Sequence, residues 1–401
     1  MLTIGGCRVD HVADEFGTPV LVVGEDALRA RASEYRTELT RRWSNSRVVF
    51  ASKSFPCTAV QRVMVEEGLG LDVAGGGEIL SALRAGVDPS LIVLHGNAKS
   101  DEELTMAVRN GVGLVVVDGP DDIDRLEELV PAGSVQDVLI RVIPGITADT
   151  HQHVLTGHLG SKFGVTPEQA HELIGRIRGS SRVRMRGVHA HVGSQILDPE
   201  PLAAAVAPLA ALGQFPIYDL GGGLGARYTW ADDPPSVGTY LDALVAAARQ
   251  HLPSEAQIIV EPGRSMVASA AATIYRVVTV KRNAKTFVAV DGGMGDNLEV
   301  ALFAQRFEAG VADRLQPTDP ETVSLVGRHC ESGDVLIDPV TLDRPRRGDL
   351  IAVPVTGAYC FTMANNYNGN RRLPVVFVAG GDAHLVVRRE TWEDLAAREV
   401  G

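Results

Sequence analysis

The chain has 401 residues, of which 45% are hydrophobic and 22% charged, so it is long and apolar enough to form about two folded domains. Its formal net charge of −12 at pH 7 would repel phosphate backbones, so we expect no nucleic-acid partner. The first residues lack an export signal and no apolar run approaches the ~18 residues of a membrane span, so we expect a cytoplasmic protein without membrane contact.

A strand-like segment, Val20–Val23, comes first, and short apolar runs then alternate with amphipathic stretches up to residue 265. The predicted strands of this region are Val48–Ala51, Leu71–Ala74, Ile92–His95, Leu114–Val117, Val138–Val142, Val188–His191, Ile217–Leu220 and Ile258–Val260. The predicted helices are Ala59–Glu67, Ile79–Arg84, Glu102–Arg109, Asp121–Leu129, Glu168–Arg178, Pro201–Leu212 and Tyr240–His251. This order predicts a (β/α)8 barrel, whereas a doubly wound sheet is disfavoured because no GxGxxG motif opens the first helix.

Beyond residue 272, strand-like runs are separated by Gly, Pro, Asp and Asn, which is typical of an antiparallel β domain. These runs are Thr273–Val280, Thr286–Val290, Val335–Ile337, Leu350–Val353, Val375–Ala379 and Leu385–Val387. We therefore predict a barrel over residues 24–272 and a β domain over residues 273–401, which the N-terminal strand in residues 1–23 joins.

Unusual polar residues follow the predicted strands, and in such barrels chemistry takes place at the carboxyl ends of the strands. Lys53 ends the first strand, where an ammonium is costly unless it is paired or chemically used, so it is a Schiff-base candidate. The other strand ends carry Asp72 with Gly75–Glu78, Arg141, His189–Gln195, Asp219–Gly223 and Glu261–Arg264. Glycines and an arginine at neighbouring strand ends predict a phosphate site.

The ordered set of these motifs resembles the fold-type III pyridoxal-phosphate decarboxylases, and among them the diaminopimelate decarboxylases. The resemblance covers nearly the whole chain and implies a barrel of the alanine racemase type followed by a β domain. The segments that carry it are Phe50–Lys53, Asp72–Ala74, Thr156–Gly157, Ser161–Gly164, His191–Gln195, Gly221–Gly223, Glu261–Arg264, Cys330–Asp334 and Gly357–Tyr359.

This resemblance implies pyridoxal 5'-phosphate as the cofactor, bound by Lys53 as a Schiff base and stacked on by His191. Further residues implied in cofactor binding are Asp72, Ser194, Gly222, Gly223, Glu261, Gly263, Arg264 and Tyr359. Residues expected to contact an amino acid substrate, free or bound to a carrier protein, are Arg141, Arg264, Glu299, Phe303, Glu331, Asp334 and Tyr359.

Two of these residues have roles that elementary chemistry supports. The cofactor draws electrons only while its ring nitrogen is protonated, and a carboxylate such as Glu261 favours that cation. Decarboxylation leaves a carbanion that must receive a proton, and Cys330 is the best candidate donor because a thiol pKa near ~8.5 suits proton transfer near neutrality. In relatives the Cys330 segment comes from the second subunit, so the resemblance also implies a homodimer with shared sites.

The chain departs from the family at Asp296–Phe303. Diaminopimelate decarboxylases usually read Arg-Pro-Ala-Leu-Tyr here, and their arginine and tyrosine grip the distal carboxylate of the substrate. Glu299 and Phe303 stand at those two positions, so diaminopimelate should fit poorly. Alternatively, a neighbouring arginine such as Arg306 replaces the lost contact.

Other interpretations remain open at this stage. An amino acid racemase or epimerase on the same fold would use the same cofactor, although racemases usually hold the ring nitrogen with an arginine. A non-catalytic pyridoxal-phosphate-binding protein would lack the C-terminal β domain and the Cys330 segment. His151, His153 and His158 match no metal-ligand spacing, so we expect no metal. His189 alternates with His191 along a strand, so we expect it to face away from the site.

Overall fold

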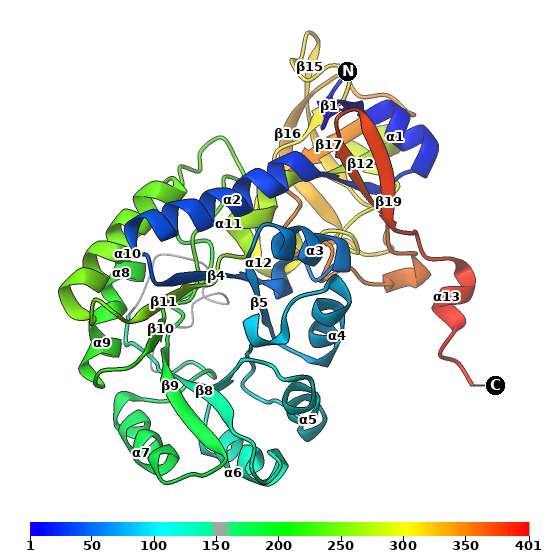
Figure 1. The fold of residues 1–401 in the computed structure, drawn as a ribbon. Helices are drawn as coiled ribbons and strands as arrows, with labels where there is room; N and C mark the ends of the chain where they lie inside the picture. The colour runs from blue at the N-terminus through cyan, green and yellow to red at the C-terminus, as the bar shows by residue number, and fades with distance from the viewer. Residues whose placement is uncertain (147–156, 158–159, 401) are drawn as a thin grey trace. The chain divides into compact units, whose positions relative to one another are not determined.

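The computed structural model describes residues 1–146, 157 and 160–400, which divide into two compact units. The barrel unit comprises Arg29–Gly225 and Pro234–Met266, and the β unit comprises Met1–Leu28, Ala226–Asp233 and Val267–Gly401. Figure 1 shows both units as a ribbon coloured along the chain. No helix in the described ranges is long and apolar enough to cross a membrane.

Parallel strands close into the predicted barrel, which confirms the fold class of this region (Figure 1). In the described part of the chain the barrel strands are β4 (Ser46–Ala51), β5 (Gly70–Val73), β6 (Ile92–Leu94), β7 (Leu114–Val117), β8 (Gln136–Arg141), β9 (Val183–His189), β10 (Ile217–Asp219) and β11 (Gln257–Val260). The ring closes where Ile258 of β11 pairs with Ser46 of β4. Buried Val49, Val93, Leu139 and Ile259 belong to one apolar cluster, as expected for a barrel interior filled by side chains.

Helices follow the barrel strands in the expected β-then-α order. They are α3 (Thr58–Glu66), α4 (Gly76–Ala85), α5 (Asp101–Asn110), α6 (Pro120–Leu129), α7 (Pro167–Arg178), α8 (Glu200–Ala204), α9 (Val206–Ala211), α10 (Val237–His251) and α11 (Arg264–Val267). Ser100 and Thr166 begin α5 and α7 with capping boxes, which satisfy free backbone N–H groups at the helix starts. The single helix predicted at Pro201–Leu212 is divided between α8 and α9.

Two helices near the N-terminus were not predicted from the sequence. They are α1 (Val9–Phe16) and α2 (Glu25–Arg42). In α2 the buried residues Leu28, Ala32, Tyr35 and Leu39 recur at helical spacing, but charged residues surround them and weaken the apolar signal.

The β unit contains a mixed sheet with the strand order β16-β15-β13-β12-β3-β18-β19. The bounds of its strands are β3 (Val20–Gly24), β12 (Ala271–Arg282), β13 (Thr286–Val290), β15 (Pro320–Val326), β16 (Val335–Asp343), β18 (Val375–Ala379) and β19 (Asp382–Val387), while β17 (Leu350–Pro354) also pairs with β12 and with β14 (Gly310–Val311). The early strand β3 lies antiparallel to β12 and parallel to β18. The purely antiparallel prediction is therefore wrong at β3–β18 and at β13–β15, because chain segments distant in sequence can enter a sheet in either direction.

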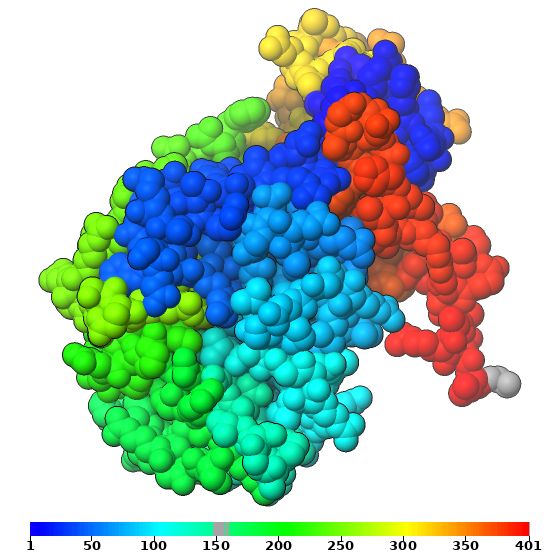
Figure 2. All heavy atoms as spheres, viewed as in Figure 1, coloured from blue at the N-terminus to red at the C-terminus, as the bar shows by residue number. Residues whose placement is uncertain are grey.

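Short elements complete the β unit. They are β1 (Thr3–Ile4), β2 (Cys7–Arg8), α12 (Glu299–Phe303) and α13 (Trp392–Ala396). The segment after β19 carries α13 as a narrow surface projection (Figure 2). Trp392, the first residue of α13, is exposed.

A buried lysine, Lys99, connects the loop after β6 to β7 and α6 through hydrogen bonds and an ion pair. Lys99 Nζ lies 2.6 Å from Asp122 Oδ2, and it donates to the carbonyl oxygens of Gly96 and Val116 at 2.6 and 2.8 Å. Burial lowers the pKa of Lys99, and the charge of Asp122 opposes that change. All these interactions depend on one ammonium group.

We therefore predict that Lys99→Met lowers the free energy of unfolding by about 3 kcal/mol, because it leaves a buried carboxylate with Arg125 as its remaining cationic partner. Urea denaturation followed by circular dichroism measures this loss. Lys281→Met at an exposed position of β12 is the matched control and should change stability by less than about 0.5 kcal/mol. Equal effects of the two substitutions would contradict the prediction.

Candidate active site

Lys53 lies directly after β4, in the short helical turn Ser52–Ser54. Its charge acts on two carboxyl groups of neighbouring elements. Burial raises the pKa of Asp72, at the end of β5, and the charges of His95 and Lys53 oppose this rise. Burial also raises the pKa of Glu78 to about 7, and the Ala74 amide and Lys53 oppose it. The structure thus places Lys53 within electrostatic reach of acids at the next strand end, and its predicted role as the Schiff-base lysine stays a prediction.

Glu261, directly after β11, lies between two histidine rings. His95 Nε2 is 2.6 Å from Glu261 Oε1, and His189 Nε2 is 3.3 Å from Glu261 Oε2. All three side chains are buried. Burial alone would raise the pKa of Glu261, but the adjacent His95 and His189 hold it well below its usual range. Glu261 is therefore an ionised carboxylate inside the barrel unit.

The prediction that His189 faces away from the site is wrong, because its ring contacts Glu261. The strand β9 ends at His189, so His191 lies beyond the strand and the alternation of side chains no longer relates the two residues. His95, which follows β6, was not among the predicted site residues. Its position at a strand end was the available signal, since the predicted strand Ile92–His95 ended on it.

His191 adopts a neutral state in this environment. Burial and the nearby charges of Lys53 and Arg141 hold its pKa well below the usual range. Its Nδ1 atom accepts a hydrogen bond from the Gly222 amide at 3.3 Å. An uncharged ring fixed by the backbone suits the predicted stacking role, because a charged imidazolium would be desolvated by a bound ring.

Glycines line the neighbouring strand ends because the backbone leaves no room for a side chain. A Cβ atom on Gly222 would lie 2.0 Å from the carbonyl oxygen of Glu261, and one on Gly223 would lie 2.6 Å from that of Gly193. Gly223 also has a φ of +131°, which favours glycine. Beside them Arg264 Nε donates to Ser194 Oγ at 3.2 Å. Bare backbone next to a guanidinium and a hydroxyl is suited to binding a phosphate.

Arg141, the last residue of β8, is buried and has its guanidinium 4.5 Å from the centre of the Phe163 ring. Burial lowers its pKa, and the negative charges of Asp118 and Glu261 oppose that change. The structure therefore groups Arg141 with the Glu261 cluster. Its predicted contact with the substrate stays a prediction.

The predicted residues of the Cys330 segment lie in the β unit, and the structure separates them into exposed and buried ones. Cys330 and Glu331 are exposed, and the Cys330 amide donates to Asn368 Oδ1 at 2.7 Å. Asp334 is buried and accepts bonds from the Met294 amide and from both the amide and Nδ1 of His329, at 2.7 to 2.8 Å. These contacts show that the oxygens of Asp334 orient its own loop, and the substrate-binding role predicted for Asp334 stays a prediction.

The other predicted residues of the β unit are Glu299, Phe303 and Tyr359. Glu299 is fully buried at the start of α12, and its Oε2 accepts a hydrogen bond from Tyr228 Oη at 3.5 Å. Phe303 ends the same helix and is half-buried. Tyr359 has a φ of +65°, an unusual conformation for a residue with a side chain, and such conformations cluster at functional sites.

Metal binding has little support in the described ranges. His151, His153 and His158 lie outside the described residues. The atoms of His95, His189 and Glu261 lie within 4.8 Å of one another, a spacing that a metal ion can use. However, ligands at ~2.0 Å from a tetrahedral zinc ion lie roughly 3.3 Å apart, so the 2.6 Å contact of His95 with Glu261 indicates an ion pair.

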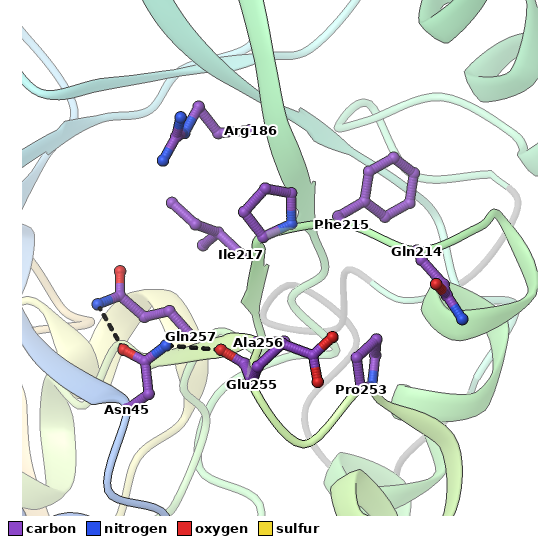
Figure 3. A pocket seen from close by; sticks show the side chains of 10 residues that line it. Asn45, Arg186, Gln214, Phe215, Ile217, Pro253, Glu255, Ala256 and Gln257 are labelled. Carbon is purple, nitrogen blue, oxygen red and sulfur yellow. Dashed lines mark hydrogen bonds between the residues drawn. The ribbon is translucent and has the colours of Figure 1, made fainter.

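A separate pocket of about 560 Å³ lies at the opposite end of the barrel strands. Figure 3 shows side chains that line it. Ile217 and Gln257, which begin β10 and β11, line it together with Asn45 and Arg186. The described lining includes none of the predicted site residues. Because chemistry in such barrels takes place at the carboxyl ends, we do not assign the active site to this pocket.

Comparisons with known proteins agree with this geometry. Residues 25–268 match the family model described as "Pyridoxal-dependent decarboxylase, pyridoxal binding domain". The chain is 39% identical to a diaminopimelate decarboxylase from Bacillus subtilis, over 98% of this chain and 94% of the relative. It is 42% identical to one from Actinosynnema pretiosum, over 100% of this chain and 92% of the relative. The crystal structure of diaminopimelate decarboxylase from Helicobacter pylori complexed with L-lysine matches with a TM-score of 0.91 and 28% identity, and covers 97% of this chain and 98% of that one.

The family model identifies the cofactor as pyridoxal phosphate, and the residues of the barrel unit fit it. Glu261 Oε1 is buried and has no hydrogen-bond partner among the described residues, so it can accept a bond from a protonated ring nitrogen. The bare backbone at Gly222 and Gly223, with Ser194 and Arg264, fits the phosphate group.

We predict that Lys53 carries the cofactor covalently. Purified protein should be yellow, borohydride should bleach the absorption, and the reduced adduct should map to the peptide containing Lys53. Lys53→Ala should lose both the adduct and turnover. The control is Lys281→Ala, which removes an exposed lysine and should leave both unchanged. An adduct on a different lysine would refute this role.

Proposed function

Because this chain belongs to the pyridoxal-dependent decarboxylases, we propose that it removes the α-carboxylate of an amino acid whose side chain does not end in a second carboxylate. One observation carries the specific part of this proposal: a buried carboxylate, Glu299, stands where diaminopimelate decarboxylases usually have the arginine that binds the distal carboxylate. A substrate with a distal amine or a neutral side chain is compatible with that charge.

The barrel unit supplies the residues that hold the cofactor in this proposal. When bound, pyridoxal phosphate accepts the electron pair that the departing carboxylate leaves behind. Ionised Glu261 stabilises a positive charge at the ring nitrogen, and Ser194 with Arg264 binds the phosphate end. Lys53 would hold the cofactor through its side-chain amine until the substrate amine is bound.

Cys330 donates the proton that completes the reaction in this proposal. Its exposure supports such a role, because a proton donor must reach the reacting carbon. Exposure also agrees with a homodimer in which the Cys330 segment completes the site of the partner subunit. Glu331, the exposed neighbour of Cys330, then offers a carboxylate to a distal amine.

The substitution at position 299 is large enough to change specificity. Two unit charges about 4 Å apart interact by about 4 kcal/mol at an effective dielectric constant of about 20, and changing Arg to Glu reverses the sign of this energy. Phe303 also lacks the hydroxyl of the usual tyrosine. The alternative clamp, Arg306, is an exposed residue that lines a surface groove with Trp230 and Phe307, and a solvated guanidinium binds a carboxylate more weakly.

We predict that the double change Glu299→Arg and Phe303→Tyr shifts preference toward diaminopimelate. The ratio of kcat/KM for diaminopimelate to that for the best distal amine, chosen from lysine, ornithine and related compounds, should rise at least about tenfold, since recovering 1.4 kcal/mol already gives that factor. CO2 release from purified holoenzyme measures both rates.

Arg306→Gln is the control for the alternative clamp and should leave this ratio unchanged. If the wild-type protein decarboxylates diaminopimelate faster than every distal amine, and Arg306→Gln removes that preference, then Arg306 is the clamp and the proposed specificity is wrong.

We also predict that Lys53 and Cys330 of different chains act in one site. Lys53→Ala and Cys330→Ala should each be inactive. In an equal mixture that exchanges subunits, about half of the dimers contain one chain of each variant, and each of these has one intact site out of two. The mixture should therefore recover up to about a quarter of the wild-type activity per site. Labelled subunits verify that exchange has taken place.

The cysteine control is Cys57→Ala, which removes a buried thiol outside the predicted site and should stay active by itself. Absence of recovery in a mixture with demonstrated exchange would show that the two residues act within one chain or that one of them has no catalytic role.

A further inference from the structure

Glu261 is held by two histidines that the proposed function does not use. His95 directly follows β6, His189 ends β9 and Glu261 directly follows β11, so all three are anchored by barrel strands. The His95 and His189 rings also meet edge to face, with their centres 4.8 Å apart. The three side chains form one buried group, which we name the His–Glu–His cluster.

Each imidazole approaches a different oxygen of the carboxylate. His189 Nε2 lies within hydrogen-bonding distance of Oε2, at 3.3 Å. His95 Nε2 is closer to Oε1, at 2.6 Å, but the two atoms are not aligned as a hydrogen bond. Glu261 Oε1 therefore has electrostatic support from His95 and still has a lone pair available to another donor.

We propose that His95 and His189 are positioning residues that keep Glu261 ionised and fixed for the ring nitrogen of the cofactor. This inference rests on the proposed role of Glu261. Neither histidine is proposed to touch the substrate. They act through the carboxylate: His189 donates its Nε2–H to Oε2, and His95 lies against Oε1, so that both favour the charged form of Glu261.

The charges around the cluster explain why such support is needed. Two acids face the cluster, Asp72 from β5 and Asp219 from β10. The basic groups near it are Arg141 of β8, Lys53 in the turn after β4 and His191 in the segment after β9. Burial and the charge of Glu261 raise the pKa of Asp219 well above its usual range. Asp72, Asp219 and Glu261 thus share a desolvated region. The two imidazoles are the part of the cluster that favours the charged form at Glu261.

His189 performs this role as a neutral ring. Burial lowers the pKa of His189 to about 4, although the charge of Glu261 opposes that change. At neutral pH His189 is therefore uncharged, and a bond to Glu261 requires the tautomer with the proton on Nε2. Its Nδ1 is buried without a partner in the described ranges, which agrees with that tautomer because Nδ1 then needs no acceptor.

The test compares His95→Leu and His189→Leu with His95→Gln and His189→Gln, because Gln keeps an N–H donor near the position of Nε2. The readout is the visible absorption of the bound cofactor as a function of pH, together with the dissociation constant of pyridoxal phosphate from the apoprotein. His171→Leu, on the exposed surface of α7, is the matched control.

Losing one donor raises the pKa of Glu261, so its ionised form disappears at a higher pH. We expect the acid transition of the absorption to move upward by about one to two pH units in the Leu variants, since a hydrogen bond to a charged group is worth about that much. The Gln variants should recover at least about half of the shift, and His171→Leu should titrate like the wild type.

Coupling to Glu261 separates a positioning role from a merely structural one. In a Glu261→Gln background, the Leu substitutions should cause no further shift, because the group through which they act is gone. Additive effects in that background would overturn the proposal. An unchanged transition in folded His95→Leu and His189→Leu proteins would also overturn it, as would one equivalent of tightly bound zinc.

Failure of this inference is distinguishable from failure of the proposed function. If the Lys53 adduct forms and CO2 is released but Glu261→Gln leaves the absorption titration unchanged, the role of Glu261 and its histidines is wrong while decarboxylation stands. If no adduct forms, the proposed function itself is wrong.

Discussion

The site depends on keeping one carboxylate ionised inside a barrel. An uncompensated charge is expensive to bury, and Glu261 is acceptable there because His95 and His189 lie against its two oxygens. Burial in the same region raises the pKa of Asp72 and of Asp219, whereas the two histidines hold the pKa of Glu261 low. Among these acids the surroundings therefore favour the charged form most at Glu261, the residue that we propose for the ring nitrogen of the cofactor.

Parallel strand geometry brings these groups together. The carboxyl ends of barrel strands share one rim, so residues from β4, β5, β6, β9 and β11 meet although they are far apart along the chain. The glycines at 222 and 223 belong to the same geometry, because side chains there would collide with backbone carbonyl oxygens. Packing thus requires glycine at the two positions that we propose for the phosphate end of the cofactor.

The β unit contributes a different kind of chemistry. Its Cys330 segment presents an exposed thiol. The buried Asp334 side chain holds that loop in place by accepting a hydrogen bond from the His329 amide. At α12 the family's usual arginine is replaced by Glu299, which Tyr228 hydrogen-bonds in the interior. In the proposed function, cofactor binding and substrate choice therefore rest on residues of different units, and we expect substitutions at 299 and 303 to alter specificity without changing the residues proposed to hold the cofactor.

Strand periodicity determined the barrel, and the resemblance carried by the ordered motifs from Phe50–Lys53 to Gly357–Tyr359 implied the cofactor, because both rest on local features of the sequence. Tertiary structure alone decided the surroundings of Glu261. His95 and His189 lie 166 and 72 positions before Glu261, and no periodicity relates residues so distant in sequence. The orientation of the His189 side chain could not be predicted from sequence because β9 ends at that residue. The pairing of β3 with β12 and β18 could not be predicted because it depends on contacts between segments far apart in the chain.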